Sequence, residues 1–262
     1  MLRLLLAFSG LLWILILPPG LRAQLAADHV AMGSAATEAH DLPAGLAHFE
    51  AALELDSTSY EANWRAAIAL LDLGEQIPEE VKSPERDSLY ARAEGLARRA
   101  VAADSGGAEG YFAVAAAMGR ASLIKGKKER IRRAAAIRDA ALRTIELDPA
   151  HDGAYHILGR WNEEIMRLSG LSRFFARQFL GAGIFSQASW SQAIANMEKA
   201  VELDTARIYH RLALAEIYTH RNRFDEARSQ LARAIALPPR EILDTAYQRK
   251  AAALAAKIAD KR

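Results

Sequence analysis

The sequence Ala200-Val-Glu-Leu-Asp204 is one of five closely similar stretches in this chain. The others are Ala52-Leu-Glu-Leu-Asp56, Ala100-Val-Ala-Ala-Asp104, Thr144-Ile-Glu-Leu-Asp-Pro149 and Ala234-Ile-Ala-Leu-Pro-Pro239. Each stretch follows an apolar pattern of helical period and stops at Asp or Pro, which predicts the end of a helix. Five helix ends of one kind predict a stacked repeat, because a helix pair can bury its apolar face only against neighbouring pairs.

The spacing of these endings identifies the repeat. The last interval, from Asp204 to Pro238, is 34 residues, the period of the tetratricopeptide repeat, a helix-turn-helix unit. The earlier intervals of 48, 44 and 56 residues fit the same unit with insertions of 14, 10 and 22 residues. The prediction is an all-α, tetratricopeptide-like solenoid of helical hairpins, a right-handed superhelix of about five repeats. Residues 240–258 have helical apolar spacing and are predicted to cap its C-terminal end.

Small residues recur on the predicted first helix of the repeats. Gly33, Gly159 and Ala215 are small where the two helices of a hairpin are expected to cross. A glycine inside a helix costs about 1 kcal/mol relative to alanine, so its presence there indicates close packing rather than helix propensity. Similar patterns at residues 63–71 and 111–118 predict two further first helices.

The composition argues against several other classes of protein. Apolar residues make up 51% of the chain and charged residues 25%, which is typical of a globular protein. Runs of β-branched residues that alternate with polar ones are absent from the sequence, so no sheet is expected. The sequence has no cysteine, no His-Glu-x-x-His and no glycine-rich catalytic motif, and its seven histidines lack the spacing of a metal site. A non-enzymatic protein without a cofactor or a metal is therefore expected.

The first 23 residues have the layout of a secretory signal peptide. A basic start at Met1-Leu-Arg3 precedes the apolar run from Leu4 to Leu17, and Pro18-Pro-Gly20 is predicted to break the helix. The run has about 14 residues, fewer than the roughly 20 of a spanning helix, which favours cleavage after Ala23 over an uncleaved N-terminal membrane anchor. The prediction is an exported protein, periplasmic or secreted, with one helical repeat domain over residues 24–258.

Charge is unevenly distributed along the predicted mature chain. Residues 24–90 hold 3 basic and 13 acidic side chains, whereas residues 91–262 hold 29 and 19. In a stacked array the order along the chain is the order in space, so one end is predicted to be acidic and the other basic. Two interpretations remain open: solvated faces of surface helices, or charged ends that steer partners.

The densest basic segment runs from Arg120 to Arg143, where only Glu129 and Asp139 are acidic. Gly126-Lys127-Lys128 is not a phosphate-binding loop, because the leading Gly and the following Ser or Thr are missing. No nucleic-acid partner is expected, because aromatic residues are not interleaved with the basic ones and the predicted mature chain is near neutral. The segment is interpreted as a charged outer helix face, or as a surface for an acidic protein or an anionic lipid headgroup. Its candidate residues are Arg120, Lys125, Lys127, Lys128, Arg130, Arg132 and Arg133.

An insertion rich in aromatic residues runs from about residue 168 to residue 190. Residues 171–179 have helical spacing, and Ser189-Trp-Ser-Gln192 is a capping-box pattern that starts a new helix. Insertions of this size are often functional. The insert is interpreted either as a lid that packs on the array or as a surface that contacts lipid or a partner. Its candidate residues are Phe174, Phe175, Phe179, Phe185 and Trp190.

The segment Ala154-Tyr-His-Ile-Leu-Gly-Arg-Trp161 resembles the regulator of microtubule dynamics family, a group of tetratricopeptide-repeat proteins. The resemblance continues through Glu198-Lys-Ala-Val-Glu-Leu203 and Arg211-Leu-Ala-Leu-Ala215, and it covers roughly residues 30–245. The resemblance implies a helical repeat domain that binds proteins. The eukaryotic members of the family are associated with microtubules or organelle membranes. This chain looks like a bacterial-type exported member, so the microtubule role is not carried over.

Residues on the inner face of the first helices are expected to line a groove that binds a protein or peptide segment. Arg160 is expected either to make a bidentate hydrogen bond to a carboxylate of the partner or to pair internally with Glu163 or Glu164. Trp161 is expected to pack against the aromatic insert. By analogy with peptide-binding members of the repeat superfamily, the groove residues are Arg65, Phe112, His156, Arg160, Glu163, Glu164, Glu216 and His220.

The repeat pattern and the lack of catalytic motifs lead to one preferred function and two alternatives. The preferred function is a non-enzymatic adaptor that holds an extended segment or a helix of another protein. The first alternative is binding or transfer of lipid or another amphiphile at a membrane, through the groove and the Phe-rich insert. The second is a structural subunit of an envelope assembly.

Overall fold

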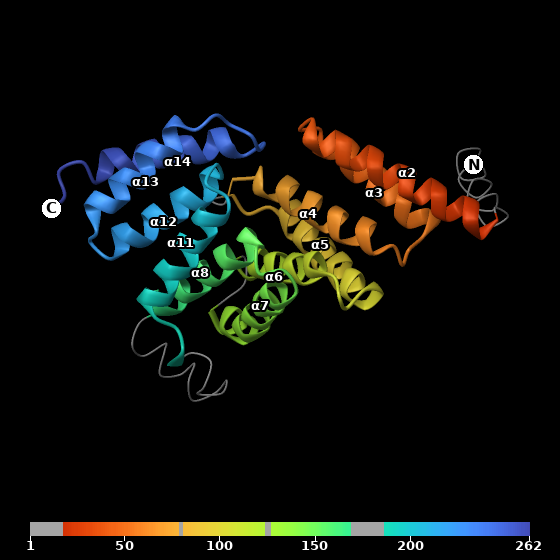
Figure 1. The fold of residues 1–262 in the computed structure, drawn as a ribbon, viewed down its shortest axis with the longest axis horizontal. Helices are drawn as coiled ribbons and strands as arrows, with labels where there is room; N and C mark the ends of the chain where they lie inside the picture. The colour runs from red at the N-terminus through yellow and green to blue at the C-terminus, as the bar shows by residue number, and fades with distance from the viewer. Residues whose placement is uncertain (1–17, 79–80, 124–126, 169–185) are drawn as a thin grey trace. The chain divides into compact units, whose positions relative to one another are not determined.

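The computed structural model describes residues 18–78, 81–123, 127–168 and 186–262. Every regular element in these residues is an α-helix, as the sequence predicts (Figure 1). The chain forms two compact units, Met1–Ala113 and Val114–Arg262, and the boundary between them falls within α6 (Ala108–Leu123).

The first unit is built from helical hairpins. The helices α2 and α3 pack as one pair, α4 and α5 pack as the next, and α3 joins the two pairs by packing against α4. These pairs are the first two repeats of the sequence pattern, and the start of α6 begins the third. Their bounds are α2 Pro19–Glu38, α3 Leu42–Leu55, α4 Tyr60–Glu75 and α5 Pro84–Ala103.

The second unit continues the same construction. The end of α6 packs on α7, α8 pairs with α11, and α12 pairs with α13, while α7 and α11 connect successive pairs. The last helix, α14, packs on both α12 and α13. The helix bounds are α7 Lys127–Leu147, α8 Asp152–Arg167, α11 Trp190–Leu203, α12 Ile208–His220, α13 Phe224–Ala236 and α14 Asp244–Lys257.

The core of the second unit is continuous where α11, α12 and α13 meet. Ile208, Leu214 and Ile217 of α12 are almost fully buried there, together with Met197 of α11 and Leu231 of α13. Burial of one such side chain contributes about 1.5–3 kcal/mol. Apolar packing therefore fixes α12 against α11 and α13.

The repeated Asp of the sequence pattern explains the turns between hairpins. Asp56, Asp104, Asp148 and Asp204 each follow the last residue of a second helix, and each backbone N–H donates to the carbonyl four residues earlier. Each carboxylate accepts a hydrogen bond from the backbone N–H two residues later, at 2.8–3.0 Å. The Asp therefore ends one helix and shapes the turn that leads into the next repeat.

Glycines allow the two helices of a hairpin to approach closely. A Cβ atom on Gly33 of α2 would lie 2.5 Å from a ring carbon of Phe49 on α3. On α8, a Cβ atom on Gly159 would lie 2.9 Å from the methyl group of Met197 on α11. Ala215 is fully buried on α12. The small residues singled out in the sequence thus lie at close helix contacts.

The first described helix begins earlier than the sequence pattern suggests. At Pro18-Pro-Gly20, where a break is expected, Pro18 is the N-cap of α2 and Pro19 lies in its first turn, where a proline needs no hydrogen-bonded N–H. The residues before Pro18 lie outside the described part, so the break itself stays a prediction. The predicted cleavage site after Ala23 lies within α2, next to Arg22, which donates to the Leu55 carbonyl at 2.7 Å. Among the described helices, none combines the length and the hydropathy of a membrane span.

The helix after the insert starts with half of the predicted capping box. The Ser189 hydroxyl accepts a hydrogen bond from the Gln192 N–H at 3.1 Å. The Ser189 N–H donates instead to the side chain of Asn162 on α8, at 3.2 Å. This bond ties the start of α11 to its hairpin partner.

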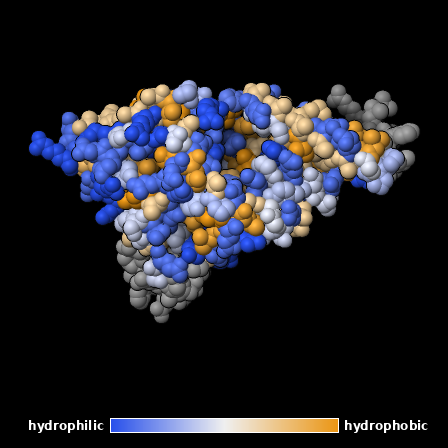
Figure 2. Space-filling view, viewed as in Figure 1, coloured by the Kyte–Doolittle hydropathy of each residue, from blue (hydrophilic) through white to orange (hydrophobic). Residues whose placement is uncertain are grey.

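The C-terminal cap is formed by α14, within the segment predicted from the sequence. Tyr247 and Ala251 of α14 are buried against the preceding hairpin. On the face drawn in Figure 2, the surface formed by α13 and α14 is mainly hydrophilic. A terminal repeat needs such a polar outer side, because no further repeat covers it.

Replacing Gly33 by alanine is expected to destabilise the protein by about 1–3 kcal/mol, because the new methyl group overlaps the buried Phe49 ring. Gly95→Ala is the matched control, since Gly95 lies on the exposed side of α5 with nothing within 4 Å of the added carbon. That control is expected to stabilise by up to about 1 kcal/mol. Urea unfolding followed by circular dichroism measures both, and equal effects would contradict the close crossing of α2 and α3.

Candidate functional site

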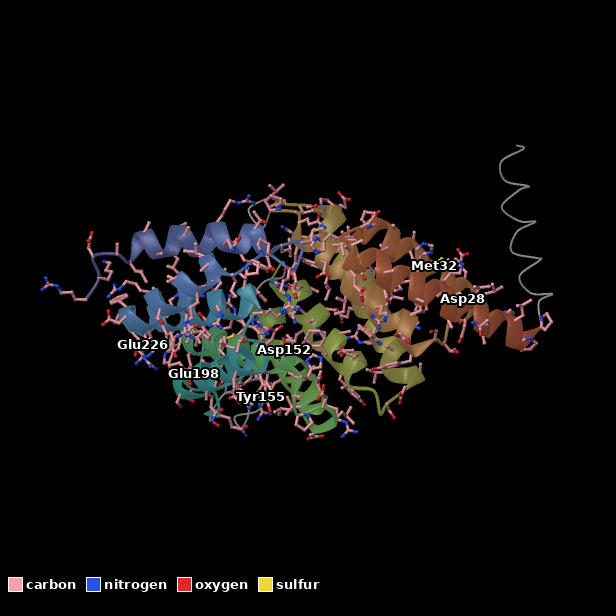
Figure 3. The ribbon with its side chains drawn as sticks, turned by 45° about the horizontal axis from the view of Figure 1, so that its top comes forward. Asp28, Met32, Asp152, Tyr155, Glu198 and Glu226 are labelled. Carbon is pink, nitrogen blue, oxygen red and sulfur yellow. The ribbon has the colours of Figure 1, made fainter. Side chains whose placement is uncertain are left out.

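Polar side chains fill the contact between α8 and α12, the first helices of two consecutive hairpins. Asp152 marks the start of α8 in Figure 3. By contrast, the contacts of α12 with α11 and α13 are mainly apolar, with two side-chain hydrogen bonds, from Tyr218 to Glu198 and from Arg211 to Gln230. We call the polar set the α8–α12 junction. Its residues are Asp152, His156, Arg160 and Glu163 from α8, and Arg207, Tyr209, His210, Glu216 and His220 from α12 and its N-cap.

Arg160 is the centre of one half of the junction. Its Nη1 atom lies 2.9 Å from Glu163 Oε2 on α8 and 2.6 Å from Glu216 Oε2 on α12. On the other side of the carboxylate, His220 Nδ1 lies 2.7 Å from Glu163 Oε1. The Glu163 side chain is fully buried, whereas the side chains of Arg160, Glu216 and His220 are 33%, 35% and 37% exposed. The cluster is therefore anchored in the interior and reaches solvent at its outer edge.

These contacts keep the buried carboxylate charged. Burial would raise the pKa of Glu163, but the hydrogen bond with His220 and the charge of Arg160 hold it below its usual value. Burial would lower the pKa of Arg160, but the charges of Glu163 and Glu216 raise it above its usual value. Arg160 and Glu163 are both ionised at neutral pH, and each compensates the charge of the other.

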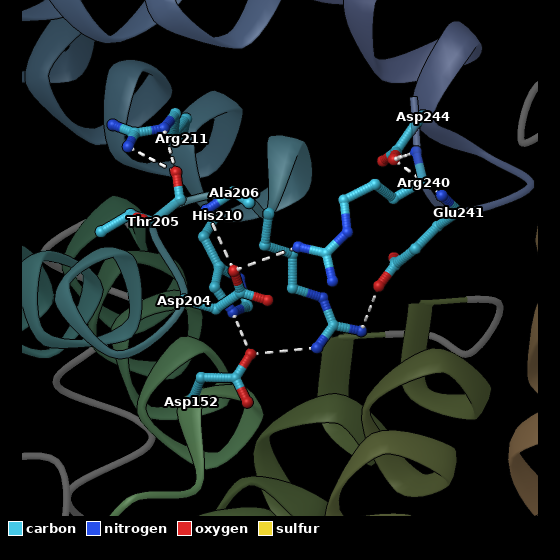
Figure 4. Close-up of polar contacts among 10 residues, drawn as sticks. Asp152, Asp204, Thr205, Ala206, His210, Arg211, Arg240, Glu241 and Asp244 are labelled. Carbon is cyan, nitrogen blue, oxygen red and sulfur yellow. Dashed lines mark hydrogen bonds and ion pairs between the residues drawn. The ribbon is translucent and has the colours of Figure 1, made fainter. Parts of the chain in front are cut away.

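A chain of one carboxylate and two histidines forms the other half of the junction. His210 Nε2 lies 2.7 Å from Asp152 Oδ2 (Figure 4), and His210 Nδ1 lies 2.9 Å from His156 Nδ1. A carboxylate only accepts hydrogen bonds, so neutral His210 donates from Nε2 and accepts at Nδ1. His156 therefore donates from Nδ1, and its Nε2 atom is an acceptor. That buried Nε2 atom has no hydrogen-bond partner among the described residues.

Both histidines are held in the neutral form. Burial lowers the pKa of His156 well below its usual value, and the charges of His210 and Arg160 lower it further. Burial also lowers the pKa of His210, although its hydrogen bond to Asp152 acts in the opposite direction. Asp152 is ionised: burial would raise its pKa, but the hydrogen bond from His210 and the charge of Arg207 lower it.

Arg207 links the junction to the C-terminal cap. Its Nη1 atom lies 3.0 Å from Asp152 Oδ2 at the start of α8. Its Nη2 atom lies 2.9 Å from Glu241 Oε1, in the segment that leads into α14 (Figure 4). One guanidinium thus joins three elements that are far apart in the sequence.

Tyr209 is the centre of an aromatic stack in the same region. Its ring lies 4.2 Å from the His156 ring and 4.7 Å from the Tyr247 ring of α14, measured between centroids. Arg120 of α6 donates to the Tyr209 hydroxyl at 3.0 Å, and its guanidinium carbon lies 5.7 Å from the Tyr209 ring centroid. The junction therefore also contacts the hairpin before α8.

The arrangement presents paired charges in a fixed geometry. Within the described ranges, no group of three or more His, Asp and Glu side chains is placed to hold a metal ion. The buried Glu163 holds Arg160 from the interior side, and the Arg160 side chain is partly exposed. Arg207 uses both of its Nη atoms in internal pairs, with Asp152 and Glu241. Charged donors held in this way suit recognition of another polar surface.

Five of the eight predicted groove residues meet in the junction. They are His156, Arg160, Glu163, Glu216 and His220. The internal pairing of Arg160 with Glu163 is present, and Glu216 adds a second pair. Glu164 lies outside the cluster and contacts Arg167 at 3.5 Å, because adjacent residues of a helix point in different directions.

Two predicted groove residues belong to the first unit. Arg65 of α4 pairs with Glu61 one turn earlier, at 2.8 Å, and its guanidinium carbon lies 4.4 Å from the centroid of the Trp64 ring. Phe112 is partly buried on α6. Their role in a groove stays a prediction.

The predicted basic surface is only partly described. Arg120 contacts Tyr209 in the junction. Arg132 and Arg133 lie 2.8 and 3.7 Å from Glu129 on their own helix. The described arginines thus divide between the junction and pairs within α7. Outside the described part lie Lys125 and the side chains of Lys127, Lys128 and Arg130.

The aromatic insert stays a prediction, because Phe174, Phe175, Phe179 and Phe185 lie outside the described residues. Trp190 begins α11, where its ring centroid lies 5.3 Å from the guanidinium carbon of Arg221. Trp161 is expected to pack against the insert, and its apolar cluster includes Leu168 and Ala188 at the two ends of that insert. Its described contacts also include α6 and α7. Its Nε1–H donates to the Ala134 carbonyl at 2.7 Å, and the ring packs in a cluster with Met118.

Several junction residues were not predicted from the sequence, namely Asp152, Arg207, Tyr209 and His210. A signal was present, because a Tyr-His pair occurs near the start of α8 at residues 155–156 and again near the start of α12 at residues 209–210. Stacked repeats bring such residues together across neighbouring helices. The histidine spacing within one helix, which tests for a metal site, does not reveal contacts between repeats.

The comparison with known proteins agrees with this architecture. Residues 26–259 match the family described as Regulator of microtubule dynamics protein 1-3. The chain belongs to this family. The resemblance found around residues 154–161 is therefore confirmed, and the match extends over parts of both units, including nearly the whole of the second. No curated protein matches the chain in a sequence search.

Two solved structures share the fold. One is a thermophilic TPR protein of Thermus thermophilus, with a TM-score of 0.61 and 19% identity, covering 87% of this chain and 99% of that one. The other is PilF of Pseudomonas aeruginosa, with a TM-score of 0.51 and 15% identity, covering 90% and 91% of the two chains. These similarities confirm the tetratricopeptide-like hairpins, and at such identities they concern the fold alone.

Replacing Glu163 by glutamine is expected to lower the free energy of unfolding by about 1–3 kcal/mol at pH 7, because Arg160 and His220 lose a buried charged partner. The contribution of the Glu163 charge is present above the unfolded pKa of 4.5 and is lost as the pH falls through the lowered folded value. The difference between wild type and variant should therefore shrink below about pH 4.5. Urea titrations across this range measure that difference.

Glu164→Gln is the matched control for this experiment. Glu164 is the next residue on α8, is partly exposed and lies 3.5 Å from Arg167, so its substitution is expected to change stability by less than about 0.5 kcal/mol. A difference between wild type and Glu163→Gln that does not depend on pH, or an equal effect of the control, would show that Glu163 is not a buried charge.

Proposed function

We propose that this protein is a non-enzymatic scaffold that binds a segment of another protein at the exposed edge of the α8–α12 junction. The observation that supports this function is the gathering of Arg160, Glu216 and His220 from consecutive hairpins, each partly in solvent. Glu163 fixes them from the buried side. Side chains that are already ordered lose little conformational entropy when a partner binds.

Arg160 is the candidate contact for a carboxylate of the partner. Both of its internal contacts use Nη1, so the donors on Nε and Nη2 are not used by them. A guanidinium has five donors in a planar fork that matches a carboxylate. A partner carboxylate would then share Arg160 with Glu216, while Glu163 stays buried beneath.

The scaffold function is preferred to the two alternatives because the junction presents charged side chains that are paired beneath and partly exposed to solvent. Binding or transfer of lipid would depend mainly on the Phe-rich insert, residues 168–190. A structural subunit of an envelope assembly would not require this set of charged side chains at the junction. The partner class that fits paired, partly buried charges is a protein or peptide segment.

Export is proposed as the setting for this function. The support is the basic start, the apolar run and the small residue Ala23, in the order of a signal peptide. After cleavage the chain would begin at Gln24, within α2, and would lack the hydrogen bond from Arg22 to Leu55. The alternative is a chain that keeps this segment as an N-terminal anchor.

Binding at the junction is tested with a double variant that leaves no buried charge unpaired, Arg160→Met with Glu163→Gln. Its matched control is Lys199→Met with Glu202→Gln, which removes one ion pair of 2.7 Å from α11. Tagged residues 24–262 of each protein serve as bait for a native envelope fraction, read by quantitative mass spectrometry. We expect a partner that wild type and control retain and that the junction variant loses about tenfold, equivalent to about 1.4 kcal/mol.

Circular dichroism establishes that the three baits have equal helix content. Equal recovery with all three baits would place the binding surface elsewhere. Loss with both double variants would indicate a general effect of surface charge, and it would also count against the junction.

N-terminal sequencing tests export, and the protein isolated from the envelope or the medium is expected to begin at Gln24. Ala23→Tyr should block cleavage, because the peptidase needs a small residue before the cut. Ala27→Tyr, on the exposed side of α2, should leave cleavage unchanged. Recovery of wild type as the full-length chain in the membrane fraction would favour the anchor.

A further inference from the structure

Two different kinds of contact hold α12 in place. Towards α11 and α13 the contacts are mainly apolar, with Met197, Ile208 and Leu231 fully buried. Towards α8 they are polar, and the N-terminal part of that contact depends on His156 and His210. Apolar contacts do not change with pH, whereas contacts through histidine do. The two sides of α12 therefore respond differently to acid.

The histidine pair can accept one proton without losing its hydrogen bond. The acceptor that makes no hydrogen bond within the described part of the chain is His156 Nε2. When this atom takes a proton, the proton on His156 Nδ1 shifts to His210 Nδ1, and the bond between the two Nδ1 atoms reverses direction. His210 is then an imidazolium that donates to Asp152. One positive charge has entered the junction, and all three groups are still connected.

A second proton removes the connection. Both Nδ1 atoms then carry hydrogen, so neither accepts, and two positively charged rings face each other at an N–N distance of 2.9 Å. The surrounding charges are nearly balanced, so they do not compensate two buried cations. The charged and titratable groups around the pair are Arg120 of α6, Asp152 and Arg160 of α8, Asp204, Arg207 and Tyr209 around the start of α12, and Glu241 and Tyr247 on the side of α14.

We propose that the α8–α12 junction is an acid-sensitive joint. Protonation of both His156 and His210 separates the N-terminal ends of α8 and α12, while the apolar contacts of α12 with α11 and α13 persist. The two hairpins then change their relative angle without unfolding. This property does not depend on the proposed function, because it concerns the protein alone.

The direction of the pH effect follows from proton linkage. In the closed form, in which His156 contacts His210, the pKa values of both histidines are lowered from 6.5. In the open form, in which the two helix ends are separated, the histidines are exposed to solvent. At pH values below 6.5 the open form therefore binds more protons than the closed form. The advantage of the closed form is therefore complete above pH 6.5 and is lost as the pH falls. Two histidines change the equilibrium between open and closed forms by up to about 100-fold per pH unit.

The absence of cysteine makes a direct test simple, because two introduced cysteines are the only sites for a thiol-reactive spin label. Ala150 and Thr205 are exposed and precede α8 and α12, so Ala150→Cys with Thr205→Cys reports on the end of the joint that opens. Double electron–electron resonance is recorded at pH 7.5 and pH 5.0. A second population at longer distance is expected at pH 5.0, with unchanged helix content by circular dichroism.

His156→Phe removes the Nε2 acceptor and keeps an aromatic ring that can stack on Tyr209. In this background the longer-distance population at pH 5.0 should fall at least fivefold. His40→Asn is the control, because His40 is exposed and its positive φ of 64° is one that asparagine tolerates. The control should respond to acid as the wild type does.

If His156→Phe does not fold, amide hydrogen exchange of the wild-type chain tests the same opening. The exchange rates at the two pH values are corrected for the intrinsic pH dependence of amide exchange. Protection should fall at pH 5.0 in the first turns of α8 and α12 and persist in α11 and α13. The proposal is overturned by an unchanged distance in the wild type, by an equal response of His156→Phe, or by loss of protection and helix content throughout the second unit.

Discussion

The aspartate that follows each second helix is the constraint on which the repeat depends. At Asp56, Asp104 and Asp204 the backbone has nearly the same extended conformation, with φ between −144° and −129° and ψ between 92° and 102°. The carboxylate fixes the next turn through the N–H two residues later. Each hairpin therefore starts in the same way relative to the helix before it, and this regularity brings the first helices α8 and α12 together.

Packing within and between hairpins follows different rules. Within a hairpin, glycine lets one helix approach a large side chain of the other, as Gly33 does with Phe49 and Gly159 with Met197. Between the last two hairpins, the first helices meet through charged and titratable groups. An apolar contact of equal size would cost less to bury, so the polar contact is the feature of this interface on which both proposals rest.

The fold was more predictable than the site, because the fold depends on patterns within one repeat. The terminal Asp, the small residues and the capping helix are all visible in short stretches of sequence. The pairing of Arg160 with Glu216 and of His156 with His210 depends on how one hairpin sits on the next, across separations of 56 and 54 residues. The start of α2 at Pro19 was not predicted, although proline is favoured in the first turn of a helix.

Arg207 has a consequence for how the C-terminal end of the chain holds together. It contacts Asp152 of the preceding hairpin and Glu241 beyond its own hairpin, so one guanidinium is shared by three separate parts of the chain. Removal of the α12–α13 hairpin would take this cation away from both carboxylates at once. The start of α8 and the segment before α14 therefore depend on the hairpin between them for charge neutralisation as well as for packing.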